Sequence, residues 1–236
     1  MHWSFFGHIT DPNNPFAAFN WYNGIGAAGC VLWMVAYYLF IRQGFRDKTY
    51  GVPMAAICLN ITWEGFTPFL PNPVPLWKII ELVWFVIDGV ILWQLWTYGK
   101  KTMLPQPLQR YHGLVVVAML AIALGFHITW HRFWDDHLLF MDAYLINMVM
   151  SILFVVFFFG RPRQEGLTIA GAWLKMIGSL FTGIQSAVFL PKVMTAHQDW
   201  SFLWFMIIVI FLADSTYIWL LYHGRRLARQ VAAQPT

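Results

Sequence analysis

Two acidic residues lie in the middle of apolar segments that are long enough to cross a membrane. Glu64 ends the motif Asn-Ile-Thr-Trp-Glu, and Asp214 lies within Phe-Leu-Ala-Asp-Ser-Thr-Tyr near the end of the chain. On insertion scales a charged side chain at the bilayer centre costs about 2.5–3.5 kcal/mol, so such residues usually face a bundle interior and are functional. Buried carboxylic acids also tend to keep their protons. The pair therefore indicates a membrane enzyme that works by proton transfer.

Five acids fall inside the apolar segments, namely Glu64, Glu81, Asp88, Asp142 and Asp214. Their spacing predicts shared helix faces. Asn60 and Glu64 are four residues apart, and Glu81, Trp84 and Asp88 follow the pattern i, i+3, i+7. At 1.5 Å rise per residue, Asp88 and Asp214 lie deepest, about 18 Å below the outer helix ends. The polar residues thus predict a cavity that opens toward the outer half of the membrane.

A structural role is the alternative for any single one of these acids, as a protonated group hydrogen-bonded between helices. Five of them are harder to explain in this way, because Lys175 is the one base inside the apolar segments and cannot neutralise them all. Some are therefore expected to be neutral at pH 7. A neutral carboxylic acid beside an ionised one is a plausible acid–base pair.

Aromatic residues are the second chemical feature, with 14 Trp, 21 Phe and 9 Tyr. Interface belts and packing account for most of them. Five lie beside or near the buried acids: Trp63, Trp84, Trp93, Tyr217 and Trp219. Aromatic faces attract cations, more strongly where water is excluded. An acid that generates a carbocation, within a pocket of aromatic faces, is what the cyclisation of an isoprenoid chain requires.

A histidine-rich stretch is the one candidate for a metal site. His127 and His131 are four residues apart, a spacing that can chelate one metal ion, and Asp135, Asp136 and His137 follow. A polar loop at a helix end explains the same residues, and we favour it. One Asp pair is not the Asp-rich repeat that binds magnesium diphosphate. We therefore predict no metal site.

Composition places the chain in a membrane. Of its 236 residues 59% are apolar and 11% are charged, whereas soluble domains carry about 25% charge. The mean hydropathy is +0.56. We expect one all-α domain, a seven-transmembrane-helix bundle. The predicted helices span roughly 20–41, 51–70, 76–98, 113–131, 138–159, 168–190 and 202–222.

The basic residues are concentrated after every second segment. Eleven follow the first, third, fifth and seventh segments: Arg42, Arg46, Lys48, Lys100, Lys101, Arg110, Arg161, Arg163, Arg225, Arg226 and Arg229. The opposite side has only Lys78, Arg132 and Lys192. The positive-inside rule then puts the N-terminus outside and the C-terminus in the cytoplasm. The net charge of +4 therefore reflects topology and not nucleic-acid binding.

The motif that ends at Glu64, together with Asp214 in the last segment, resembles the integral-membrane terpene cyclases of meroterpenoid biosynthesis. These are the pyripyropene-type cyclases of fungi and their bacterial relatives, and the resemblance covers the whole chain. It implies that Glu64 and Asp214 form the acid machinery. It also implies a lipophilic substrate drawn from the membrane lipid, in which a farnesyl-length chain is attached to an aromatic or indole-type group. Cyclisation of that chain would be initiated at an epoxide or an olefin.

The same resemblance implies no cofactor, because no diphosphate leaves in such a reaction. The compact loops and the scarcity of Lys and Arg near the N-terminus favour a bacterial cytoplasmic membrane. A fungal host would imply the endoplasmic reticulum instead. The oligomeric state is left open.

Two other functions remain in competition. A proton-coupled transporter or channel also uses intramembrane acids, although the chain shows no repeat halves and no matching helix breaks. A metal-dependent enzyme built on His127, His131 and Asp135 is the third. A microbial rhodopsin is excluded, because residues 202–222 contain no lysine to form a Schiff base.

Overall fold

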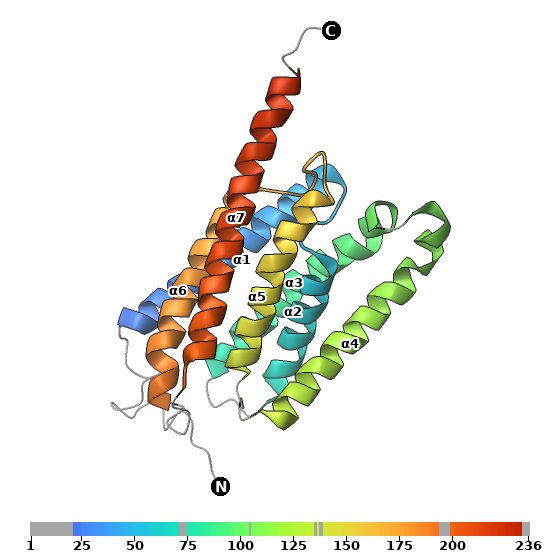
Figure 1. The fold of residues 1–236 in the computed structure, drawn as a ribbon. Helices are drawn as coiled ribbons and strands as arrows, with labels where there is room; N and C mark the ends of the chain where they lie inside the picture. The colour runs from blue at the N-terminus through green and yellow to red at the C-terminus, as the bar shows by residue number, and fades with distance from the viewer. Residues whose placement is uncertain are drawn as a thin grey trace.

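The computed structural model describes residues 21–70, 75–103, 105–134, 136, 139–193 and 199–232, and every element in them is helical. The α-helices are α1 Trp21–Asp47, α2 Met54–Phe66, α3 Pro75–Met103, α4 His112–Phe133, α5 Phe140–Phe159, α6 Ile169–Val193 and α7 Ser201–Ala232. Short 3-10 helices, η1 Thr67–Phe69 and η2 Gln106–Tyr111, follow α2 and precede α4. The prediction of an all-α bundle is confirmed for this part of the chain (Figure 1).

Six of the described helices are long and apolar enough to cross a membrane, and α2 is the exception. A crossing helix needs about 20 residues, whereas α2 has 13. Proline sets both of its ends. Pro53 precedes the first turn, and Pro68 lies in the 3-10 turn that follows. The predicted segment 51–70 is thus a helix over Met54–Phe66 only. The number of membrane crossings stays a prediction.

The last helix differs from its prediction in the opposite sense. α7 continues to Ala232, well beyond the predicted end at 222. The apolar pattern marks only the part that fits a bilayer, whereas helical hydrogen bonding continues through the polar residues that follow.

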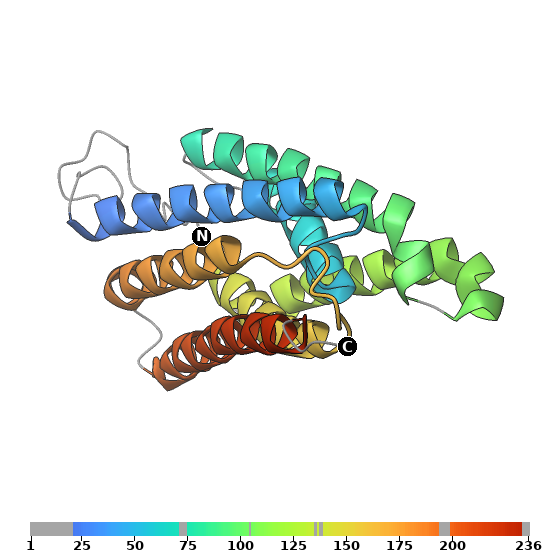
Figure 2. The same ribbon diagram turned by 90° about the horizontal axis from the view of Figure 1, so that it is seen from above.

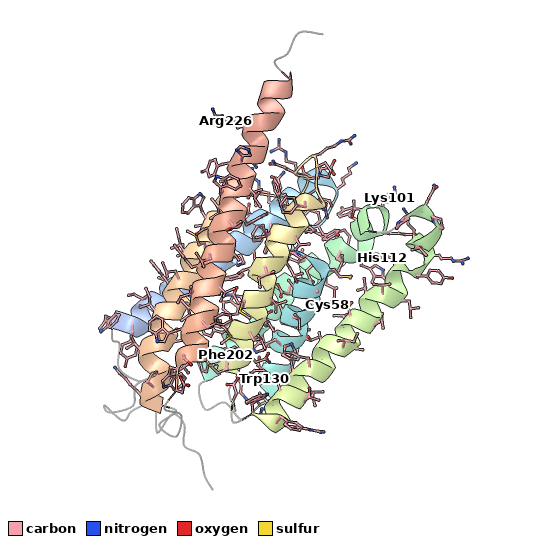
Figure 3. All side chains as sticks on the ribbon, viewed as in Figure 1. Cys58, Lys101, His112, Trp130, Phe202 and Arg226 are labelled. Carbon is pink, nitrogen blue, oxygen red and sulfur yellow. The ribbon has the colours of Figure 1, made fainter. Side chains whose placement is uncertain are left out.

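The seven described α-helices form one bundle, and α2 lies near its centre. α1 packs along α6, α7 packs against α5 and α6, and α2 contacts α3, α4 and α5 (Figure 2). The helices alternate in direction, and α1 begins at the end opposite to that at which α7 finishes (Figure 1). Arg226 and Lys101 lie toward one end of the bundle and Phe202 and Trp130 toward the other (Figure 3). The arrangement places the short helix, and with it Glu64, inside the bundle.

Small residues allow α1 and α6 to approach closely. A Cβ atom on Gly29 would lie 2.9 Å from the carbonyl oxygen of Gly178 and 2.9 Å from Cγ2 of Thr182. Contacts of this kind are typical of helix pairs in membranes, where small residues let the backbones meet. The outer faces of the long helices carry exposed apolar side chains such as Val86, Ile122 and Leu212. That surface suits a lipid environment.

Candidate active site

A cavity of about 140 Å³ lies among α1, α2, α3, α5 and α6. Its aromatic lining consists of Trp33, Tyr37, Trp63, Trp84, Phe140 and Tyr144. One acid, Glu64, is part of the lining, together with neutral polar side chains from α2, α5 and α6. The cavity therefore places a carboxyl group beside several aromatic faces.

Glu64 combines burial with an unused hydrogen-bonding atom. Its side chain is 4% exposed, and Oε2 has no hydrogen-bond partner in the described part of the chain. Asp88 and Glu81 are also buried and lie close enough to Glu64 to interact with it electrostatically. Because like charges repel, ionisation of all three carboxyl groups at once is unfavourable. Glu64 on α2 thus lies within electrostatic reach of both acids on α3, although only Glu64 belongs to the cavity lining.

Asn60 lies one helical turn before Glu64 and also lines the cavity. Its side-chain Nδ2 donates a hydrogen bond to the hydroxyl oxygen of Tyr37 on α1. Tyr37 in turn lies within electrostatic reach of both Glu64 and Asp88. The amide thus ties the acidic turn of α2 to the aromatic wall that α1 supplies.

Four of the five predicted aromatic residues divide into two groups. Trp63 and Trp84 line the cavity, and Trp63 is held there by a hydrogen bond of 3.3 Å from Nε1 to the carbonyl of Leu139. Trp93 and Trp219 are 50% and 60% exposed and do not belong to the lining. Trp93 follows Asp88, and Trp219 follows Asp214, by five residues. Five residues are about 1.4 helical turns, so neither tryptophan shares a helix face with its acid.

Asp214 lies apart from the cavity lining, in a buried ion pair with Lys175. Lys175 Nζ donates to Asp214 Oδ1 at 2.7 Å, to Asp214 Oδ2 at 2.9 Å and to Ser151 Oγ at 2.7 Å. Tyr217 is buried one turn further along α7, with its ring centroid 5.1 Å from that of Phe154. The two carboxyl groups singled out in the sequence thus belong to separate clusters, one at the cavity and one between α6 and α7.

His127 and Asp142 form a buried contact that connects three helices. His127 Nδ1 lies 2.6 Å from Asp142 Oδ2, and Nε2 lies 3.0 Å from the carbonyl oxygen of Leu59. Both ring nitrogens are therefore engaged, which leaves no lone pair for a metal ion. No cluster of three or more His, Cys, Asp or Glu that could hold a metal occurs among the described residues. Asp135 and His137 lie outside them.

Asp136 stabilises the start of α5. Its Oδ2 accepts hydrogen bonds from the backbone N–H of Asp142 at 2.9 Å and from Trp130 Nε1 at 3.0 Å. Burial raises the pKa of Asp136, and these hydrogen bonds oppose that rise. Leu139 lies in the left-handed region, with φ of 56°, and its backbone N–H donates to the Asp136 carbonyl at 2.9 Å. The Leu139 carbonyl accepts the hydrogen bond of Trp63 and so holds one wall of the cavity.

Several lining residues could not be recognised from the sequence. Trp33 and Tyr37 are four residues apart on α1, and Tyr144 and Asn147 are three apart on α5. Their spacing shows that each pair shares a face, but only the packing shows that both faces meet at Glu64. Tyr144 donates a hydrogen bond of 2.9 Å to Ser186 Oγ, which adds a polar side to the cavity.

Comparison with known proteins gives matches over most of the chain. The profile of the Pyr4-like transmembrane terpene cyclases matches residues 6–227. The terpene cyclase macJ of Penicillium terrestre is 25% identical over 164 residues, 67% of this chain and 63% of that protein. The Pyr4-family terpene cyclase mfmH of Annulohypoxylon moriforme is 27% identical over 67% of each chain. Asnovolin H synthase nvfL of Aspergillus novofumigatus is 26% identical over 83% of each. No solved structure matches the chain.

Proposed function

The chain belongs to the Pyr4-like transmembrane terpene cyclases, and we propose on that premise that it cyclises a prenyl chain in the cavity beside Glu64. The substrate we infer is a lipophilic meroterpenoid precursor, a farnesyl-length chain on an aromatic or indole-type group. It enters from the lipid. The observation that carries the proposal is an acid with an unpartnered oxygen, in a cavity that six aromatic side chains help to line between apolar helices.

Glu64 is the proposed initiating acid. Its protonated carboxyl donates to the terminal epoxide oxygen or to the terminal alkene carbon of the folded chain. The epoxide C–O bond, or the alkene π bond, then breaks to leave a carbocation. An internal double bond attacks that cation, forms the first ring bond and moves the charge along the chain. Loss of a proton from the last cation, to a carboxylate or to water, completes an isomerisation in which no atom is gained or lost.

The surroundings of Glu64 suit this chemistry in two ways. Trp63 and Trp84 supply aromatic faces to the cavity, and such faces stabilise cations where water is excluded. Asp88 and Glu81, which interact with Glu64, can share its proton before the reaction and restore it afterwards. A cavity that holds the chain folded also supplies much of the orientation that ring closure needs. No metal is required, because no diphosphate has to leave.

A conversion assay tests the proposed activity. The reconstituted protein is incubated with excess chelator and a farnesylated aromatic compound, once with the terminal epoxide and once with the terminal alkene. We expect a product of unchanged mass and altered retention time from one of the two. Absence of such an isomer from a panel of these substrates would contradict the proposal. A proton flux in liposomes that needs no substrate would then support a transporter.

A further inference from the structure

The ion pair between Lys175 and Asp214 is almost completely enclosed, with side chains 0% and 1% exposed. Burial of two charges is costly, and a well-packed apolar pair in the same place is often at least as stable. Stability therefore gives a weak account of these residues. Their contacts lead from α7 back toward the cavity, and those contacts suggest another role.

Trp33 is the first step of this connection. Lys175 Nζ lies 5.3 Å from the centroid of the Trp33 ring, and Trp33 lines the cavity. Gly178, one turn after Lys175 on α6, gives the ring the space it needs. A Cβ atom at Gly178 would lie only 2.7 Å from Trp33 Cδ1. α6 thus contacts the Trp33 ring at two points. The Lys175 ammonium group lies over the ring, and Gly178 leaves room for it because it has no side chain.

Tyr37 and Asn60 continue the connection toward the acid. The rings of Trp33 and Tyr37 meet edge to face, with centroids 5.3 Å apart and planes at 89°. The Tyr37 hydroxyl accepts the hydrogen bond of Asn60, which lies one turn before Glu64. An unbroken series of contacts therefore runs from Asp214 through Lys175, Trp33 and Tyr37 to the turn of α2 that carries Glu64.

We propose that Asp214 is a positioning residue, which acts through Lys175 on the Trp33 and Tyr37 wall of the cavity and does not donate the initiating proton. Both of its carboxyl oxygens accept hydrogen bonds from Lys175, and its side chain is not part of the cavity lining. This inference rests on the proposed cyclase function. It divides the two acids by role, because Glu64 faces the substrate and Asp214 holds the wall against which the chain folds.

Paired substitutions test the inference. Lys175→Met and Asp214→Asn each leave one buried polar partner without its counterpart, and we expect each to lower turnover per folded protein by more than about tenfold. The double variant Lys175→Met/Asp214→Asn removes both charges together. We expect its turnover to recover to within about tenfold of wild type. Size-exclusion chromatography provides the amount of folded protein.

The product distribution separates positioning from mere folding. If the aromatic wall is displaced, the prenyl chain that carries the carbocation is less well ordered. Both single variants should therefore give a larger share of partly cyclised isomers. Trp33→Leu, which leaves both charges in place, should change the distribution in the same direction. Ser215→Ala, next to Asp214 and in contact with Met176 Sδ at 3.5 Å, is the matched control and should keep the wild-type distribution.

Three results have distinct meanings. A double variant as inactive as Asp214→Asn, beside an active wild type, would overturn the inference, because removal of both charges would then fail to restore the cavity wall. An unchanged product distribution in both single variants and in Trp33→Leu would overturn it too, because the pair would then serve folding alone. A wild-type protein that forms no isomer would contradict the proposed function itself.

Discussion

The buried acids and the aromatic residues of this chain differ in their surroundings according to the helix face they occupy. Glu64 and Trp84 meet at the cavity, although they come from α2 and α3. Trp219 has a similar sequence environment but stacks on His223, with ring centroids 5.1 Å apart, and is mostly exposed. Proximity in sequence to an acid is therefore a weaker guide to the cavity than the shared helix face.

This division predicts opposite results for two tryptophan substitutions. Trp84→Leu removes an aromatic face from the cavity, and cation–aromatic interactions are worth about 0.5–2 kcal/mol. We expect turnover to fall by about 2- to 30-fold, with more early-terminated product. Trp219→Leu removes a ring of the same kind outside the cavity and should leave turnover and products unchanged. Product analysis by mass spectrometry checks both. Equal losses in the two variants would contradict the assignment of the cavity.

Two local features of the helices position the residues that line the cavity. Prolines lie at the ends of α2, and glycines lie between α1 and α6. Pro53 and Pro68 keep α2 to 13 residues, which lets it lie within the bundle beside α3, α4 and α5. The close approach of α1 and α6 brings Trp33 onto α6. Both features act on the cavity from outside its lining.

A comparison of two glycines tests the α1–α6 contact. Gly29→Ala would place a Cβ atom 2.9 Å from the Gly178 carbonyl oxygen, and overpacking of this kind costs about 1–3 kcal/mol. Gly125→Ala on α4 adds the same atom with nothing within 4 Å, so helix propensity alone should make it neutral or stabilising. We expect a lower unfolding temperature in detergent for the first variant only. A Gly29→Ala protein as stable as wild type would show that the helices can separate without loss.

The class of fold and part of the site could be predicted from the sequence. Spacing along one helix was sufficient for Asn60 with Glu64 and for Trp84 with Asp88, because each pair shares a face. Spacing could not show that Lys175 pairs with Asp214, since which helices are neighbours depends on packing across the whole bundle. Trp33 and Tyr144 were missed for the same reason. The length of α2 was overestimated, because apolar residues continue past the prolines that end the helix.

The whole molecule combines seven described helices with basic residues gathered toward one end. Alternating helix directions place the start of α1 and the finish of α7 at opposite ends (Figure 1). From the positive-inside rule we predict that the end with Lys101 and Arg226 faces the cytoplasm. This topology requires the short α2 to lead the chain from one side of the membrane to the other.

Reporter fusions at the two termini test this topology. We expect a C-terminal green fluorescent protein to fluoresce and a C-terminal alkaline phosphatase to be inactive, because the C-terminus is predicted to be cytoplasmic. An N-terminal phosphatase should be active. Two termini on the same side would contradict an odd number of crossings and would require α2 to return to the side from which it entered.

The proposed cyclisation depends on Glu64 as the acid at the cavity. The most direct test compares wild type, Glu64→Gln and Glu165→Gln in liposomes, with chelator and the farnesylated substrate. Glu165 is the control, because its side chain is 45% exposed and lies outside the candidate membrane spans. We predict that wild type and Glu165→Gln form the isomer, and that Glu64→Gln, folded by size-exclusion chromatography, is at least about 100-fold slower. An equally active Glu64→Gln protein would contradict the account.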